Sequence, residues 1–204
     1  MEPQERIVTK AHELFLRYGI RSISMDEIAT HLGISKKTIY QFFADKDSLV
    51  SAVVGIEIEE NVRECEAFRV MAQDPVHEFC LAVDKMEEMM QMMNPAVFFD
   101  MQKYHPASFR KFEEHVTGFM YGIVRSNLLK GVEMDLYRPG LDVDILSRFR
   151  LASIFMMFNP EYFPVGRIEL GKALRETTMN FLYGIANAKG QKLIAKYNQE
   201  RVKN

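Results

Sequence analysis

The side chains with the clearest binding chemistry lie in one short run, GISKKTIYQFF, from Gly33 to Phe43. The run holds two lysines, a threonine, a tyrosine and a glutamine, and it contains no acidic residue. Such side chains can bind phosphate oxygens and can read base edges in the major groove of DNA. The first fifty residues carry seven basic and seven acidic side chains, so positive charge is concentrated in this run. The run is therefore the first candidate for a binding site.

Different residues around this run suit different parts of a DNA duplex. The candidates for base edges carry a donor, an amide or a methyl group near the start of a short helix, and they are Lys36, Lys37, Thr38 and Gln41. The candidates for phosphate contacts carry a hydroxyl or an ammonium group, and they are Ser24, Ser35, Tyr40 and Lys46. The alternative interpretation is a capped pair of helices with a solvated lysine face and no partner.

Two predicted short helices position these side chains. In ISMDEIATHLG, Ser24 is placed as an N-cap and Glu27 follows three residues later, which is the pattern of a capping box. Gly33 is placed to end that helix, and Ser35 can cap a second helix that begins at Lys36. Two short helices joined by a turn of about three residues that contains glycine predict a helix-turn-helix.

An earlier amphipathic helix over ERIVTKAHELFLRYG completes a three-helix module. Within the run, we expect Ile39, Phe42 and Phe43 to face inward and to seat the second short helix on this module. Asp45 is placed to cap a longer fourth helix that begins at Lys46.

The rest of the chain also follows helical periodicity, with no sustained alternation of the strand type. Asp74 and Pro75 open one further helix. The other predicted helices span about 95–103, 106–130, 142–158 and 167–187, and the polar tail predicts only a short, frayed helix. The fold class is therefore all-α. We expect a helix-turn-helix domain over residues 1–50 and a larger helical domain over residues 51–204.

Between Glu5 and Val54 the sequence resembles the TetR family of transcriptional regulators. The family pattern is a helix ending in F-x-x-x-G, then T/S-x-x-x-I-A-x-x-x-G-[VI]-S-x-x-x-[IL]-Y-x-[YH]-F-x-x-K-x-x-L. The matching positions are Phe15, Gly19, Ser24, Ile28, Ala29, Gly33, Ile34, Ser35, Ile39, Tyr40, Phe43, Lys46 and Leu49. Phe42 departs from the pattern, since the family often carries tyrosine or histidine there.

The resemblance implies more than the residues alone indicate. It implies an all-helical homodimer that reads a palindromic operator, with a variable C-terminal domain that binds a small-molecule effector. The function expected is a ligand-responsive repressor. The two cysteines without a disulfide pattern favour a cytoplasmic location, and the segments rich in methionine and phenylalanine favour an apolar or aromatic effector. The alternative is a helical carrier or enzyme whose N-terminal helix pair does not bind DNA.

Flexible and aromatic side chains mark a candidate effector pocket in the C-terminal part. They are Met86, Met89, Met90, Met93, Phe98, Met101, Tyr104, Phe119 and Met120. Ordinary core packing is the alternative for each of these residues. The last two long predicted helices carry a candidate dimer interface, which only the resemblance favours over intramolecular core. Its residues are Phe149, Ala152, Phe155, Ala173, Thr177, Phe181 and Gly184.

Composition argues against several other classes of protein. With 26 basic and 28 acidic residues, the chain has no global attraction to nucleic acid, so any such surface is local. The two cysteines form no disulfide framework or zinc pattern, and no motif indicates a catalytic residue, a metal site or a cofactor. No apolar run is long enough to predict a membrane span.

Overall fold

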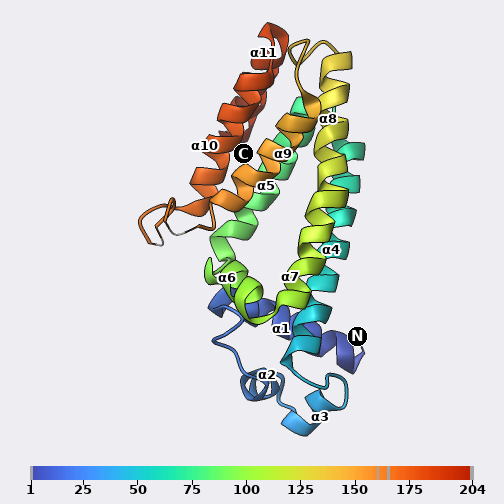
Figure 1. The fold of residues 1–204 in the computed structure, drawn as a ribbon, viewed down its shortest axis with the longest axis vertical. Coiled ribbons are helices and arrows are strands. Elements are labelled where there is room, and N and C mark those ends of the chain that lie inside the picture. The colour runs from blue at the N-terminus through green and yellow to red at the C-terminus, as the bar shows by residue number, and fades with distance from the viewer. Residues whose placement is uncertain (1, 160, 165, 203–204) are drawn as a thin grey trace. The chain divides into compact units, whose positions relative to one another are not determined.

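A computed structural model describes residues 2–159, 161–164 and 166–202. The described residues form helices and one isolated bridge pair, but no strand (Figure 1). In chain order the helices are α1 (Pro3–Tyr18), α2 (Met25–Leu32), α3 (Lys36–Tyr40), α4 (Lys46–Met71), α5 (Pro75–Met92), α6 (Ala96–Tyr104), α7 (Pro106–His115), the π-helical turn η1 (Val116–Met120), α8 (Tyr121–Glu133), α9 (Val143–Met156), α10 (Leu170–Ile185) and α11 (Ala188–Val202). The predicted all-α class with an N-terminal three-helix module is confirmed.

The chain divides into two compact units. The first unit comprises Met1–Val62 and Met92–His115, and the second comprises Arg63–Gln91 and Val116–Asn204. α4 continues from the first unit into the second without a break. A functional boundary near residue 50 would fall inside this helix, and that boundary stays a prediction. No described helix is long and apolar enough to cross a membrane.

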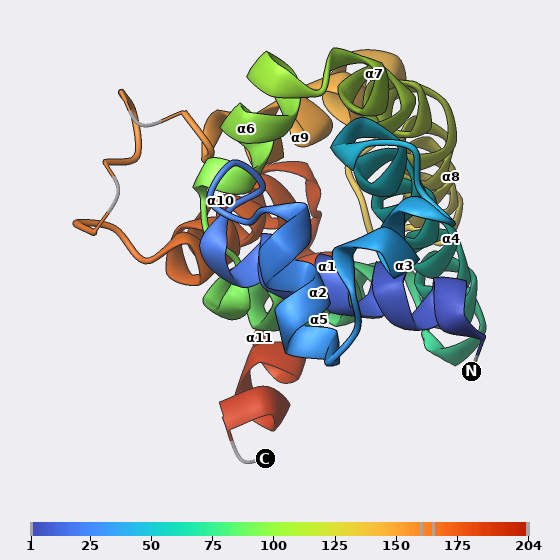
Figure 2. The same cartoon turned by 90° about the horizontal axis from the view of Figure 1, so that it is seen from below.

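The core of the first unit is built from the apolar faces of α1, α2, α3 and the start of α4, with a contribution from α6. Figure 2 shows these helices from below. Ala11, Ile28, Ile39 and Leu49 are fully buried there, one from each of the first four helices. Met101 of α6 joins the same core, although it is far from these residues in the sequence. Burial of these side chains fixes α3 on the module.

The tail is a correction to the sequence analysis. Instead of a short, frayed helix, the structure has α11 with fifteen residues. Ile194 and Tyr197 are buried, and the Tyr197 ring stacks on His77 with 4.6 Å between ring centroids. The Tyr197 hydroxyl also donates a hydrogen bond to Asp74 at 2.5 Å. Tertiary packing thus stabilises a helix whose polar composition suggested a weak one.

The helix predicted over residues 106–130 is interrupted. α7 ends at His115, the π-helical turn η1 follows, and α8 then runs to Glu133. Phe119 and Met120, two candidate pocket residues, lie in this turn. Single π turns inside helices are frequent at functional sites.

In the second unit, the segment after α8 is hydrogen-bonded to the end of α10 and to the connection between α10 and α11. Tyr137 and Ala186 form the isolated antiparallel bridge, and the Arg138 amide donates to the Ile185 carbonyl at 2.8 Å. The Tyr137 ring is buried directly against Gly131 of α8, where an added Cβ would lie 2.0 Å from a ring carbon. Glycine at this position is what allows the ring to approach the helix.

This packing predicts opposite effects for two glycines of α8. We expect Gly131→Ala to lower the free energy of unfolding by about 2–3 kcal/mol, because the new methyl group overlaps the Tyr137 ring. Gly122→Ala is the control, since no atom lies within 4 Å of its added Cβ, and we expect it to gain about 0.5–1 kcal/mol from helix propensity. Denaturant unfolding of both variants measures the difference, and equal effects would contradict the packing.

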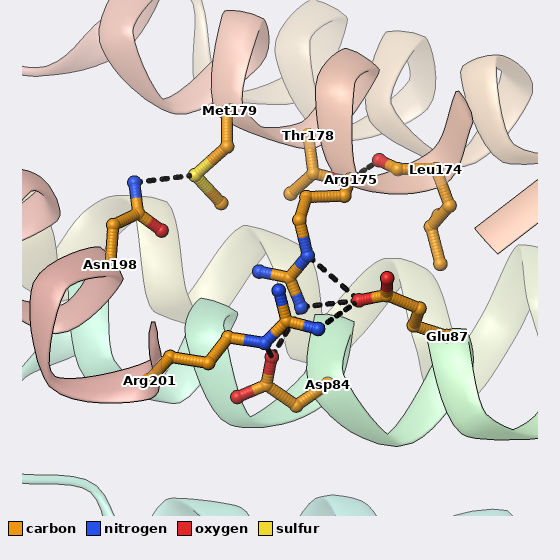
Figure 3. Close-up of polar contacts among 8 residues, drawn as sticks. All are labelled: Asp84, Glu87, Leu174, Arg175, Thr178, Met179, Asn198 and Arg201. Carbon is orange, nitrogen blue, oxygen red and sulfur yellow. Dashed lines mark hydrogen bonds and ion pairs between the residues drawn. The ribbon is translucent and has the colours of Figure 1, made fainter. Parts of the chain in front are cut away.

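Four charged side chains connect α5, α10 and α11 within the second unit (Figure 3). Glu87 accepts hydrogen bonds from Arg175 Nε at 2.7 Å and from Arg201 Nη2 at 2.6 Å. Asp84 pairs with both arginines, and its Oδ1 lies 3.0 Å from Arg201 Nε. Glu87 and Arg175 are largely buried, so removing either side chain would leave the other as a buried charge with less compensation, which destabilises the fold.

Candidate nucleic-acid interface

Local capping fixes the geometry of α2 and α3, as predicted. The Ser24 hydroxyl accepts a hydrogen bond from the Glu27 amide at 3.2 Å, and the Glu27 carboxylate accepts one from the Ser24 amide at 2.6 Å. Gly33 adopts the left-handed conformation, with φ 66° and ψ 30°, and ends α2. The Ser35 hydroxyl then accepts from the Thr38 amide at 3.1 Å and begins α3. The predicted capping box, glycine stop and second cap are all present.

With Ile39 buried beneath it, α3 turns its polar side chains outward, and we call Lys36, Lys37, Thr38, Tyr40 and Gln41 the reading face. Lys36 pairs with Asp26 of α2 at 2.8 Å, and this hydrogen bond raises the pKa of Lys36. Lys37 and Gln41 are exposed, and within the part of the chain that the structure describes neither side chain is engaged by another group. They are therefore the members of the reading face most available to a partner.

Two other members of the reading face are partly engaged. The Thr38 hydroxyl lies 2.8 Å from the Ser35 hydroxyl, so its methyl group is the part left for an apolar contact. Tyr40 is 44 % exposed, and the Lys36 ammonium lies 6.0 Å from its ring centroid. The exposed phenol of Tyr40 remains able to donate to a phosphate oxygen. Every DNA contact named from the sequence stays a prediction.

Phe42 differs from its expected position. The structure buries Ile39 and Phe43, but it leaves Phe42 39 % exposed. α3 ends at Tyr40, so the helical spacing used to place Phe42 inward no longer applies at residue 42. An exposed aromatic ring therefore flanks the reading face.

Lys46 is engaged inside the first unit. Its ammonium donates a hydrogen bond to the Ile20 carbonyl at 2.6 Å and lies 5.8 Å from the centroid of the Phe15 ring. Burial lowers the pKa of Lys46, while neighbouring carboxylates, Asp100 first among them, oppose that effect. The lysine thus ties the start of α4 to the start of the α1–α2 connection. The phosphate contact expected of Lys46 stays a prediction, and in this structure its ammonium already has an acceptor.

A test separates these two roles of Lys46. We expect Lys46→Met, which keeps the apolar stem, to lower the free energy of unfolding by about 1–2 kcal/mol through loss of a charge-assisted hydrogen bond. If Lys46 acts only through its hydrogen bond to the Ile20 carbonyl, the salt dependence of DNA binding stays as in the unmodified protein. A flattened salt dependence with unchanged stability would instead assign Lys46 to a phosphate. Denaturant unfolding and a salt titration of the same variant measure the two effects.

Sequence reasoning missed Asp100. This carboxylate is 6 % exposed in α6, and it accepts a hydrogen bond from the Arg21 amide at 2.8 Å. Nearby, the backbone N–H of Asn94 donates a hydrogen bond to the backbone carbonyl of Leu16 at 2.6 Å. The segment that leads into α6 therefore contacts the end of α1, and α6 itself contacts the α1–α2 connection. The only signal in the sequence is a single acid within the apolar run AVFFDM.

Residues 7–53 match the family model described as bacterial regulatory proteins, tetR family. This match covers less than a quarter of the chain and identifies an N-terminal module of the tetR family. The matched residues include the capped α2–α3 pair and the whole reading face.

Two curated relatives and one solved structure extend the similarity. The uncharacterized HTH-type transcriptional regulator YvaF of Bacillus subtilis (strain 168) is 25 % identical over 164 residues, 78 % of this chain and 82 % of that protein. The regulator SAUSA300_2515 of Staphylococcus aureus (strain USA300) is 40 % identical over 58 residues, 28 % of this chain and only 31 % of that protein. A TetR family regulator from Agrobacterium tumefaciens has the same fold, with a TM-score of 0.73 at 14 % identity over 90 % of this chain and 97 % of that one.

The candidate pocket residues of this chain fall in both compact units. Met86, Met89 and Met90 of α5 belong to the second unit, together with Phe119 and Met120. The candidates that belong to the first unit are Met93, Phe98, Met101 and Tyr104. Met101 is buried in the core beneath the three helices α1–α3, which we call the reading module, and Phe98 packs against that core. Core packing, the alternative weighed above, describes these two residues in the structure.

The candidate dimer residues divide by exposure. Phe149 is 58 % exposed and Ala152 is also exposed, and with Ile145 and Met156 they form an outward apolar stripe on α9. Gly184 of α10 is exposed as well. Phe155 and Thr177 are half-buried, whereas Ala173 and Phe181 are buried in their own unit. The interface stays a prediction, for which the α9 stripe is the best-placed part.

Proposed function

We propose that this chain is a tetR-family regulator, a homodimeric repressor that reads a palindromic operator and is released from it by a small-molecule effector. The observation that carries the proposal is the reading face. α3 is capped at Ser35 and seated by buried Ile39, and it presents unengaged Lys37 and Gln41 side chains outward. A recognition helix needs this combination of an apolar seat and a free polar surface.

Homodimer formation is part of the proposal, and the exposed stripe on α9 supports it. Four apolar or small side chains recur there at helical spacing and face solvent in the single chain. Two copies related by a twofold axis would bury such a stripe in a self-complementary contact. Two recognition helices about 34 Å apart, or a multiple of that distance, then enter successive major grooves on one side of the duplex.

For effector response, we propose that α4 carries the signal. It is one unbroken helix that begins at the reading module and ends in the second unit. In the first unit, the docking of Asp100 on the α1–α2 connection is a second contact through which a shift of α6 would reach the module. An effector changes operator affinity only by the difference between its affinities for the two states. We place the site of action in the cytoplasm, where the chromosome is.

The test is operator affinity with and without effector. A DNA fragment from the region upstream of the gene that encodes this chain is titrated with the full protein. The titration is repeated in the presence of metabolite fractions that have been separated by polarity. We expect at least one apolar or aromatic fraction to weaken binding tenfold or more. If every fraction leaves the affinity unchanged, the effector response is wrong. If no duplex binds better than a scrambled control, the alternative of a carrier or enzyme takes its place.

A further inference from the structure

One arginine in the second unit is buried and has no charged partner among the residues that the structure describes. Arg150 lies in α9, and only 3 % of its surface is exposed. It shares the inward face of the helix with Ser147 and Leu151, which are also buried. Among the described residues, no group accepts a hydrogen bond from its buried Nη1 atom. Because a guanidinium stays charged at neutral pH, burying it without a partner is costly.

Arg175, in the same unit, differs from Arg150 because two carboxylates pair with it. Burial lowers the pKa of Arg175, but its hydrogen bonds to Glu87 and Asp84 outweigh burial and raise it (Figure 3). For Arg150, burial lowers the pKa of the guanidinium to about 10, and no acidic group opposes the shift. Within the described part of the chain, Arg175 therefore has two carboxylate partners and Arg150 has none.

The surroundings of α9 indicate what kind of molecule would satisfy Arg150. α9 packs against α8 and α10, whose buried positions are mostly apolar, among them Val124, Leu128, Leu174 and Leu182. Ser147, the nearest buried polar residue on the same face, donates its hydroxyl proton to the Val143 carbonyl at 2.7 Å. The planar fork of a guanidinium matches the two oxygens of a carboxylate or phosphate group.

We propose that Arg150 binds the oxyanion, a carboxylate or a phosphate, at one end of an otherwise apolar effector. The proposal rests on the effector response above and gives the effector a chemical class that the sequence alone lacked. The oxyanion supplies the missing counter-charge, and the apolar side chains of α8 and α10 take the rest of the molecule. Arg150 is then the residue that distinguishes an acid from the alcohol of the same size.

The experiment compares matched probes on the full protein without DNA. Dodecanoate, dodecyl phosphate and dodecanol, each below its micelle-forming concentration, are titrated with thermal unfolding and calorimetry as readouts. Shorter and longer chains and the pair benzoate and benzyl alcohol complete the panel. We expect at least one acid or phosphate to bind the unmodified protein tenfold or more tightly than its alcohol. The two dodecyl anions distinguish carboxylate from phosphate.

Two substitutions on the same helix assign the preference. Arg150→Met is expected to abolish the acid preference while alcohol binding persists. Arg148→Met, which removes the same charge from an exposed position, is expected to leave the preference intact. If Arg150→Met does not fold, Arg150→Lys replaces it, and we expect a reduced preference because lysine lacks the bidentate fork.

Three results would overturn the proposal. They are equal binding of every anion and its alcohol by the unmodified protein, an acid preference that survives Arg150→Met, or an undiminished preference in Arg150→Lys. Failure of the proposed function looks different, because it is measured by DNA release. Acids that bind through Arg150 without changing operator affinity would refute the effector response and leave the oxyanion site standing.

Discussion

Replacing Lys37 with alanine is expected to weaken operator binding by about 30-fold or more and to relax the base preference at one position in each half-site. Lys37 is the exposed lysine of the reading face that no other described side chain engages. A lysine that reads guanine contributes about 1–3 kcal/mol of discrimination, and a symmetric dimer makes that contact twice. A loss of about 2 kcal/mol already corresponds to roughly 30-fold in affinity.

The measurement for Lys37 is fluorescence anisotropy with the operator and with a set of its single base-pair variants. Lys103→Ala is the matched control, since it removes the same charge from an exposed position on α6 of the first unit. We expect that variant to keep both the base preference and, within about threefold, the affinity. A Lys37→Ala protein that loses affinity equally for all duplexes would make Lys37 a phosphate contact instead of a reader.

Replacing Glu87 with glutamine is expected to have the largest effect on stability. Glu87 is 13 % exposed in its side chain, and it receives hydrogen bonds from both Arg175 and Arg201. Its loss leaves one carboxylate, Asp84, for two guanidinium groups. We expect the free energy of unfolding to fall by about 2–3 kcal/mol, because Arg175 stays largely buried with less counter-charge. For a chain of this length the melting temperature should fall by about 4–10 °C.

The neighbouring residue provides the control for Glu87. Glu88 is exposed, and no described residue pairs with it, so Glu88→Gln changes the same charge without touching the network. We expect its melting temperature to stay within about 1 °C of the unmodified protein. Hydrogen exchange should also localise the effect, with α11 losing protection in Glu87→Gln. Equal melting temperatures for the two variants would show that the ion pairs of Glu87 with Arg175 and Arg201 do not contribute to stability.

Local chemistry made the reading module predictable from the sequence. The Ser24 and Glu27 pair, the left-handed Gly33 and the Ser35 cap each act within a few residues, so their spacing suffices to place α2 and α3. The same reasoning failed at Phe42, because helical spacing was extended past the end of α3. It also underestimated α11, whose stability comes from burying Ile194 and Tyr197 and not from its own composition.

Long-range partners could not be derived from the sequence. The acceptor of the Lys46 ammonium is the Ile20 carbonyl, and the donor to Asp100 is the Arg21 amide, 79 residues away along the chain. Arg148 and Arg150 stand two residues apart in SRFRLA, yet one is exposed and the other is buried. Which of them faces the interior depends on how α9 packs, and spacing alone leaves both choices open.

Our main proposal is that α3 reads a duplex through its exposed polar face, and a salt titration of operator binding provides the sharpest test of this claim. The logarithm of the affinity is measured against the logarithm of the salt concentration for the operator and for a scrambled duplex of equal length. With several phosphate contacts in each module, we expect a slope steeper than about −4, and tighter binding of the operator at every salt concentration. A slope near zero, or equal affinity for the two duplexes, would contradict the claim.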